Sequence, residues 1–431
     1  MDVKIIATLG PKSEDKRTVK KMIEEGADIF RLNASHIKDE EELKEYISMI
    51  REVNKEIPIM LDLPGPKVRT KNIDPIQIER GKTYTIGNNA DIDAEWSDLK
   101  GLKKGTILRI SDGKIEFECI DVENGLAKIK AMNSGVILER QSINYPGISY
   151  KEGLTEKDKQ FSRFAVKHNV DIVALSFVRS EKEILELRKI VKDKPIVAKI
   201  EVEEGVKNFE GICNESDAVM VARGDLALNI RDMFVLPEIQ RKLIRLSKER
   251  RKPVIVATQM LASMVNNPYP TRAEITDIYN AIYEGADALM LSEETAIGKY
   301  PTRCIYTMRK IIKDYKGETL YVDARDINDK IAKAAIEIAA GEGISTLVAI
   351  TRTGATAARL SVFDNKKIIA IVDSEKVLNT LKLYRNVFPI LSKRNISIKE
   401  ILRKEKLNKT VVVGSDKEGG TTTYIKVEYS D

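Results

Sequence analysis

The sequence predicts an α/β protein: a TIM (β/α)8 barrel with an inserted small β-barrel lid domain and a C-terminal α/β domain. Three observations predict this fold. Eight short apolar runs alternate with longer amphipathic segments, an interval of short alternating segments interrupts that rhythm, and a second series of strand and helix patterns follows the eighth run.

The eight apolar runs are the expected barrel strands. They begin near Val3, Asp28, Pro58, Val170, Pro195, Ala218, Pro253 and Ala286. The segments 15–25, 40–54, 181–191, 237–250 and 272–283 carry apolar residues at spacings of three and four, which is typical of helices with one buried face. We therefore expect the barrel domain to comprise residues 1–66 and 147–323.

The interval from residue 67 to residue 146 has a different pattern. Its segments TYTIG, TILRI, KIEFECI and LAKIKAM alternate polar and apolar residues, and turn signals such as Asp112-Gly113 and Asn124-Gly125 separate them. The interval follows the third barrel strand, and the loops after barrel strands surround the active site. It is therefore expected to be a β domain that covers the barrel mouth as a lid.

The last part of the sequence, residues 324–431, is expected to form a third domain. A helical pattern over residues 329–340 precedes the strand-like runs TLVAIT, KIIAIV and TVVVG, with helical segments between them. This alternation predicts a small open α/β sheet.

The composition argues against several classes of protein. Lys and Arg total 72 and Asp and Glu total 66, so a net charge of +6 remains from two mixed populations. Nucleic-acid binding needs basic residues concentrated on one face, so this mixed charge gives it little support. A mean hydropathy of −0.27, with no apolar run of about 18 residues, argues against a membrane protein.

Other sequence features favour a cytoplasmic protein. Residues 1–11 lack the pattern of a signal peptide. Cys119, Cys213 and Cys304 are widely separated, have no zinc-type spacing and suit reduced thiols. We expect a cytoplasmic protein with neither a nucleic-acid nor a membrane partner.

Polar residues follow the apolar runs, at the edge where a TIM barrel holds its active site. Lys199 and Glu201 are two residues apart on one strand, so both face the barrel mouth, and Asp225 follows the next strand. The two carboxylates offer oxygen ligands suited to Mg²⁺. Arg31 and Lys199 would add positive charge suited to phosphoryl transfer. The alternative is an internal Lys-Glu ion pair that fills the barrel.

Ten motifs stand in the order and spacing found in pyruvate kinases. They are ATLGPKS, FRLNASH, LDLPGPKVRT, LTEKD, SFVRS, AKIE, MVARGDL, ATQML, PTRAE and GADALML followed by ET. The chain thus resembles the pyruvate kinase family over the barrel and the insertion and, more loosely, over the C-terminal domain. The resemblance implies transfer of phosphate from phosphoenolpyruvate to ADP, giving pyruvate and ATP. It also suggests a homotetramer.

The resemblance implies a role for each matching residue. Glu201 and Asp225 match the ligands of Mg²⁺ or Mn²⁺. The catalytic positions are Lys199, Arg31, Thr258 and Ser292, and the substrate-binding positions are Arg31, Lys199, Gly224, Asp225 and Thr258. Asn33, His36 and Arg69 match nucleotide-binding positions, although His36 could instead be a capping or packing residue ahead of the helix at Asp39.

Some positions depart from the family pattern. Ser180 stands where many relatives have a nucleotide-contacting Lys, Ala227 and Asn229 replace Gly and Glu, and Glu293 replaces another Gly. These changes leave the expected metal ligands and Lys199 in place, so they bear on nucleotide affinity and local backbone shape.

Lys67 is the most informative departure. Relatives that need K⁺ have Thr at the position of Leu63 and Glu at the position of Lys67. The chain resembles the K⁺-independent branch, in which a tethered ammonium replaces the ion. We expect Lys67 to lie near Asn33, Ser35 and Asp62, with no requirement for K⁺; the alternative is a solvated hinge lysine.

An effector site is expected in the C-terminal domain. The segment from Thr351 to Thr356, including Thr353 and Gly354, joins a strand to a helix and presents N–H groups and hydroxyls suited to a phosphate. An ordinary βα turn is the alternative. The loop 414–423 lacks the Trp and Arg of relatives that bind fructose bisphosphate, which favours AMP or a sugar monophosphate.

Two other functions remain open at this point. One is another Mg²⁺-dependent barrel enzyme that acts on phosphoenolpyruvate or pyruvate, such as an aldolase-type lyase. The other is a catalytically weakened metabolite sensor that binds its ligand through residues 351–356. Retention of Arg31, His36 and Arg69, together with the lid, argues against the lyase.

Overall fold

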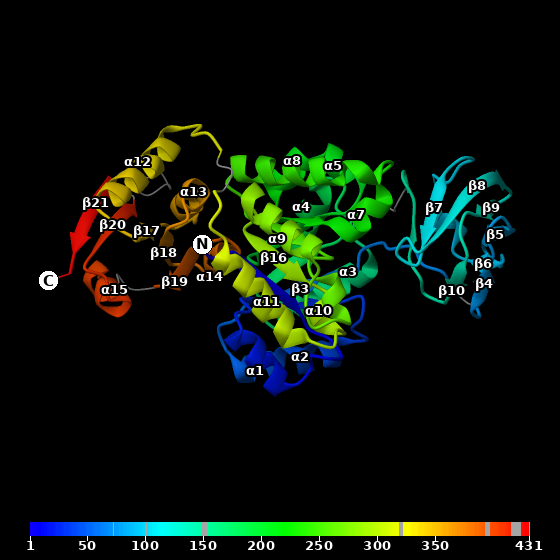
Figure 1. Cartoon of the computed structure of the whole chain (residues 1–431), viewed down its shortest axis with the longest axis horizontal. Coiled ribbons are helices and arrows are strands. Elements are labelled where there is room, and N and C mark those ends of the chain that lie inside the picture. Colours follow the sequence, from blue (N-terminus) through cyan, green and yellow to red (C-terminus); the bar gives the residue numbers. More distant parts are fainter. Residues whose placement is uncertain are drawn as a thin grey trace.

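The computed structural model describes residues 1–71, 73–99, 101–148, 153–318, 322–392, 397–414 and 424–430. A closed barrel of eight parallel strands stands in the middle of the molecule (Figure 1). The strands are β1 (Lys4–Thr8), β2 (Ile29–Asn33), β3 (Ile59–Asp62), β12 (Ile172–Leu175), β13 (Ile196–Ile200), β14 (Ala218–Ala222), β15 (Val254–Ala257) and β16 (Ala288–Leu291). Each expected run forms one strand, which confirms the predicted fold class.

Helices surround the barrel. They are α1 (Lys16–Glu24), α2 (Glu40–Val53), α3 (Glu156–Lys167), α4 (Glu181–Val191), α5 (Glu203–Lys207), α6 (Phe209–Glu215), α7 (Arg223–Asn229), α8 (Leu236–Glu249), α9 (Arg272–Glu284), α10 (Glu293–Ala296) and α11 (Pro301–Asp314), with 3-10 turns at Met233–Val235 and Ala262–Val265. The longer helices follow the predicted segments because their apolar spacing buries one face against the strands. Side-chain caps help to fix their starts, as where Asp15 accepts from the N–H of Thr18.

The insertion forms its own β unit beside the barrel, at the right of Figure 1. Its larger sheet has the order β11-β7-β8-β9-β5-β6, and β10 pairs with β4. The elements are β4 (Ile76–Ile78), β5 (Thr83–Gly87), β6 (Ile92–Asp93), a 3-10 turn at Trp96–Asp98, β7 (Ile107–Ile110), β8 (Ile115–Glu123), β9 (Leu126–Ala131), β10 (Gly135–Ile137) and β11 (Ile143–Asn144). Phe117 and Tyr145 belong to a core distinct from that of the barrel, to which Phe177 and Val202 of the barrel domain also contribute.

The C-terminal unit lies on the opposite side of the barrel from the insertion. Its sheet has the order β19-β18-β17-β20-β21, in which β21 is antiparallel. The elements are α12 (Ile327–Gly341), β17 (Thr346–Ile350), α13 (Ala355–Phe363), β18 (Lys367–Val372), α14 (Glu375–Leu381), β19 (Val387–Leu391), α15 (Ile398–Glu405), β20 (Lys409–Gly414) and β21 (Tyr424–Tyr429).

The floor of the barrel contacts the C-terminal unit. Leu383 is fully buried in the cluster of side chains that fills the barrel interior. Asn386 donates its backbone N–H to the carbonyl of Asp2, and Arg251 forms an ion pair with Asp329 of α12. The C-terminal unit is therefore tied to the end of the barrel away from the strand ends that carry the candidate site. Among the helices of the described residues, none combines the length and the apolar character that a membrane span requires.

Candidate active site

A buried carboxylate, Asp62 at the end of β3, joins two cations at the barrel mouth. Arg31 on β2 donates from Nε to Asp62 Oδ2 at 2.7 Å. Lys199 on β13 lies 3.0 Å from the other oxygen, Oδ1, and donates to Ser176 Oγ at 2.7 Å. The side chains of Arg31, Asp62 and Lys199 are only 9%, 1% and 9% exposed. One counter-ion thus holds two positive charges side by side in a site with little access to water.

The charges of this cluster set the protonation of its members. Burial alone would raise the pKa of Asp62, but Lys199 and Arg31 outweigh it and hold the pKa below 3.8. Burial disfavours the charged form of Lys199, yet Asp62 and Glu201 raise its pKa above 10.5. At neutral pH the carboxylate is ionised and the ammonium is charged.

Glu201 lies beside Lys199, just beyond the end of β13. Its Oε1 is 3.1 Å from Lys199 Nζ, and its Oε2 accepts from the backbone N–H of Phe177 at 2.6 Å. Burial raises the pKa of Glu201, the charge of Lys199 opposes this, and Asp225 adds to the rise by repulsion. Glu201 and Asp225 carry like charges, and a cation bound by both would offset their repulsion.

Glu201 and Asp225 could hold a divalent cation of the Mg²⁺ type. Such an ion accepts one or two protein carboxylates and completes its shell with water and substrate oxygens. No cluster of three or more His, Cys, Asp or Glu side chains suited to a metal occurs among the described residues. The pair thus fits a hard ion that keeps open positions better than a closed structural zinc site.

Lys67 has a partner that the sequence did not predict. Its ammonium donates to Asp225 Oδ1 at 2.7 Å, and its expected place beside Asn33, Ser35 and Asp62 stays a prediction. The oxygens of Asp62 are already engaged by Arg31, Lys199 and Ser176. The lysine therefore pairs with the second candidate metal ligand, and its side chain is only 18% exposed, which does not match a freely solvated hinge residue.

Gly224, Thr258 and Ser292 follow β14, β15 and β16, the three strands that complete the mouth. The N–H of Gly224 donates to Thr258 Oγ1 at 2.8 Å, so β14 and β15 are linked at this point. Thr258 and the next residue, Gln259, have positive φ values of 73° and 56°, which L-residues rarely adopt. Ser292 Oγ is buried and has no hydrogen-bond partner among the described residues.

The expected nucleotide residues lie at one side of the mouth. Asn33 Oδ1 accepts from the N–H of Ser35, and Arg69 donates to the carbonyl of Arg140. Desolvation lowers the pKa of His36 below 6.5, and the charges of Arg69 and Arg31 lower it further. Asp39, whose side chain accepts from Glu42 N, caps α2. His36 is therefore not the cap of that helix.

The positions that depart from the family pattern have structural partners or lie at element ends. The N–H of Ser180 donates to Glu183 at the start of α4, Ala227 is half-buried in α7, and Glu293 begins α10. Asn229 is 1% exposed. It donates to the carbonyl of Glu201 at 3.1 Å and accepts from Asn144 of the insertion at 3.2 Å. Asn229 thus joins the lid to the strand of a candidate metal ligand.

The expected effector loop is a compact strand-to-helix turn. Gly354 has a φ of +83° and donates its N–H to Thr351 Oγ1 at 3.0 Å. A Cβ at this glycine would also press on Val377 at 3.2 Å. Thr353 is exposed and Thr356 is buried. The loop 415–423 lies outside the described residues, so the structure adds nothing to the effector preference drawn from it.

Two residues of the site were missed as functional groups. Asp62 was expected only as a cation ligand, whereas it is the shared counter-ion of Arg31 and Lys199. Arg223, which follows the strand beginning at Ala218, was not singled out for a role. In both cases the position at a strand end was a usable signal, but the partner could not be read from the sequence.

The fold and the site define the class of barrel proteins that carry paired cations and neighbouring carboxylates at the strand ends. The profile for pyruvate kinase, barrel domain, matches residues 1–305, and the profile for pyruvate kinase, alpha/beta domain, matches residues 329–427. The chain is 36% identical to the pyruvate kinase of Thermotoga maritima, covering 91% of this chain and 89% of the relative. It is 36% identical to that of Thermococcus litoralis, covering 93% and 90%.

A crystal structure of a pyruvate kinase from Cryptosporidium parvum has a TM-score of 0.90 and 29% identity, covering 100% of this chain and 96% of that one. The chain belongs to the pyruvate kinase family. It is a phosphotransferase that converts phosphoenolpyruvate and ADP to pyruvate and ATP, and the family uses a divalent metal ion. The lyase and sensor alternatives are not supported.

Proposed function

We propose that the phosphoryl group of phosphoenolpyruvate is held between Arg31 and Lys199. The observation that carries this proposal is the arrangement of both cations on Asp62, which keeps them charged and immobile before substrate arrives. Phosphoryl transfer depends on positioning and on stabilising the charge of the transferring oxygens. In this proposal the ammonium of Lys199 also stabilises the enolate oxygen that remains after transfer.

The substrate carboxylate binds at the start of α7, at the backbone of Gly224 and Asp225, beside Thr258. The link from Gly224 N to Thr258 Oγ1 supports this, because it fixes the two groups together. Ser292, whose buried hydroxyl has no hydrogen-bond partner among the described residues, supplies an oxygen to the proton path by which the enolate becomes pyruvate.

Glu201 and Asp225 are the proposed ligands of Mg²⁺, for which Mn²⁺ can substitute. When bound, the ion neutralises charge on the phosphoryl oxygens. The residues of the chain align the substrates around it. ADP approaches from the side of Asn33, His36 and Arg69, and Arg69 offers the positive charge for its phosphates.

The enzyme is proposed to work without K⁺, as in the Lys-containing branch of the family. Lys67 places a tethered positive charge against Asp225 in a partly buried position. A fixed ammonium at the carboxylate cluster can supply the charge that a bound monovalent ion would otherwise add. Asn33, Ser35 and Asp62 remain the proposed neighbours of this charge, and Asp225 is its hydrogen-bond partner.

The C-terminal unit, residues 324–431, is proposed to bind AMP or a sugar monophosphate at Thr351, Thr353, Gly354 and Thr356. The turn supports this because Thr353 is exposed and its backbone is fixed by Gly354. We retain 1–66 with 147–323 as the catalytic domain and 67–146 as the lid, and we place the enzyme in the cytoplasm.

A homotetramer is also proposed. Ile275, Tyr279 and Tyr283 are spaced by four residues along α9 and are 39%, 39% and 42% exposed. Such an apolar face is typical of a contact between subunits.

A coupled assay tests the proposed function. Purified protein is mixed with phosphoenolpyruvate, ADP and Mg²⁺, and ATP and pyruvate are measured separately. Equal amounts of both products are expected. Pyruvate without ATP would point to a lyase or hydrolase, and ligand binding without either product would point to a sensor.

A further inference from the structure

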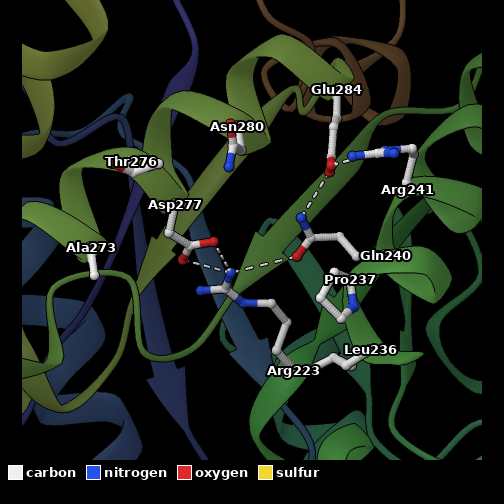
Figure 2. Close-up of a pocket in the computed structure, with 10 residues that line it drawn as sticks. All are labelled: Arg223, Leu236, Pro237, Gln240, Arg241, Ala273, Thr276, Asp277, Asn280 and Glu284. Atoms are coloured by element: carbon white, nitrogen blue, oxygen red, sulfur yellow. Dashed lines mark hydrogen bonds and ion pairs between the residues drawn. The ribbon is translucent and has the colours of Figure 1, made fainter. Parts of the chain in front are cut away.

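A cavity of about 410 Å³ lies on the outer side of the barrel, between α8 and α9. Figure 2 shows the polar side chains that line it, including Arg223, Gln240, Asp277 and Glu284. Arg223 differs from the others because it is the first residue of α7, the helix that carries Gly224 and Asp225. Its side chain runs from the active-site face of the barrel to the wall of this cavity.

The guanidinium of Arg223 has two sets of contacts. On the cavity side, Nη1 lies 2.8 Å and 2.7 Å from the two carboxylate oxygens of Asp277. On the barrel side, Nη2 donates to the backbone carbonyl of Thr258 at 2.7 Å and lies 2.8 Å from Met260 Sδ. Arg223 is 9% exposed, so most of its length is held by the protein.

The carbonyl that Arg223 holds belongs to a strained turn. Thr258 has a φ of 73° although it is β-branched, and Gln259 follows at 56°. Such a backbone persists only where neighbouring groups fix it. The side chain of the same threonine accepts from the N–H of Gly224. Arg223 therefore fixes the turn that sets the position of both Thr258 Oγ1 and the Gly224 amide.

We propose that Arg223 is a positioning residue for the carboxylate end of phosphoenolpyruvate, and that Asp277 holds it in place from the cavity. The inference rests on the substrate site proposed above. Arginine suits this role because its planar fork contacts two partners in fixed directions, whereas the ammonium of lysine cannot span both. Arg223 itself does not touch the substrate.

The test uses the full-length enzyme with Arg223→Ala, Arg223→Lys and Asp277→Asn. We expect Arg223→Ala to raise the KM for phosphoenolpyruvate at least about tenfold while the KM for ADP stays within about twofold. Arg223→Lys should also have a raised KM for phosphoenolpyruvate, because lysine cannot make both contacts. Asp277→Asn keeps the side-chain shape and should raise the same KM by a smaller factor.

Rescue separates positioning from general packing. Arg223→Ala leaves room for a guanidinium ion next to an open cavity, so low millimolar guanidinium chloride should lower the raised KM, and urea should not. Arg241→Ala is the matched control, because Arg241 lines the same cavity and pairs with Glu284 without reaching Thr258. It should have the wild-type KM and no response to guanidinium.

Calorimetric titration of phosphoenolpyruvate with Mg²⁺ present measures affinity without turnover. If wild type forms no ATP, the proposed function is contradicted. The affinities of wild type and Arg223→Ala for phosphoenolpyruvate would still test the role of Arg223. A wild-type KM and affinity in Arg223→Ala would overturn the inference. If that variant does not fold, an unchanged affinity in Asp277→Asn would overturn it.

Discussion

Asp62 is the residue on which the charge arrangement at the barrel mouth depends. It is fully buried and bonded to both Arg31 and Lys199, which are themselves nearly buried. Two buried cations without a counter-ion would repel each other and pay a large desolvation cost. The carboxylate therefore allows the site to keep two positive charges where the phosphoryl oxygens are proposed to lie.

Glu201 gives a prediction about the metal ion. Glu201→Gln removes one of two charged oxygen ligands while keeping the side-chain size. The Mg²⁺ concentration for half-maximal rate should rise at least about tenfold, equivalent to roughly 1.4 kcal/mol. Titration of Mg²⁺ in the coupled assay measures this, with direct Mn²⁺ binding as a second readout. An unchanged metal curve would mean that the carboxylates form only an internal ion-pair network.

His36 gives a prediction about pH. Its pKa is lowered below 6.5 by desolvation and by Arg69 and Arg31. As the pH falls, the imidazole of His36 takes up a proton at a higher pH in the unfolded chain than in the folded protein. Its contribution to the free energy of unfolding is therefore fully present above pH 6.5 and is lost as the pH falls through the lower pKa of the folded protein. Wild type should lose more thermal stability than His36→Gln between about pH 7 and pH 5.

The pKa of His36 can also be measured directly. The protein has two histidines, so the imidazole signals are readily assigned by NMR with the help of His36→Gln. Arg69→Met should move the pKa back toward 6.5, because a nearby positive charge is removed. A pKa at or above 6.5 in wild type would refute this description of the nucleotide side.

Lys67 gives a prediction about monovalent cations. Wild type should run equally fast in potassium and tetramethylammonium salts. Lys67→Glu places a carboxylate beside Asp225, so it should be slow without K⁺ and recover with it, because a mobile cation restores the balance of charge. Lys71→Glu is the control, since it reverses a charge four residues further along the chain. A requirement for K⁺ in wild type would reject the role of Lys67.

Elements with a strong pattern were predictable, and irregular ones were not. The eight barrel strands and α4 lie within the expected segments because continuous apolar runs and three-four spacing are strong signals. β19 (Val387–Leu391) was missed because Pro389 interrupts its pattern, and it is tolerated there because β19 is an edge strand. α5, α6 and α7 are too short to show a helical period.

The candidate site was predictable only in part, because local sequence shows which residues end the strands but not which distant residues they contact. The strand ends identified Lys199, Glu201 and Asp225, because parallel strands bring their ends to one face of the barrel. The contact of Lys67 with Asp225 joins residues 158 positions apart, across the start of the lid. The path of the chain through the insertion decides this pairing, and local sequence does not encode it.

The turn before α13 gives a prediction at the scale of an element. Thr353→Glu puts a negative charge where the effector phosphate is proposed to bind, so repulsion should abolish the response to AMP or sugar monophosphates. The maximal rate should be unchanged because the turn lies outside the barrel. Thr353→Gln, of similar size but uncharged, should still respond. A normal response in Thr353→Glu would place the effector site elsewhere.

The molecule as a whole puts two accessory units at opposite sides of one barrel (Figure 1). The insertion contacts the strand-end side through Asn144 and Asn229, next to Glu201. The C-terminal unit contacts the barrel floor through Leu383 and the Arg251–Asp329 pair. The C-terminal unit and the proposed substrate site therefore lie at opposite ends of the barrel.

The rate of ATP formation by Lys199→Met measures what this lysine contributes to phosphoryl transfer. We propose that Lys199, held by Asp62, stabilises the transferring phosphoryl group and the enolate. Removing such a charge from a transition state costs about 3 to 4 kcal/mol, or roughly 10² to 10³ in rate. We expect that loss of rate in Lys199→Met, with phosphoenolpyruvate and Mg²⁺ still bound in calorimetry. A rate within about threefold of wild type would contradict it.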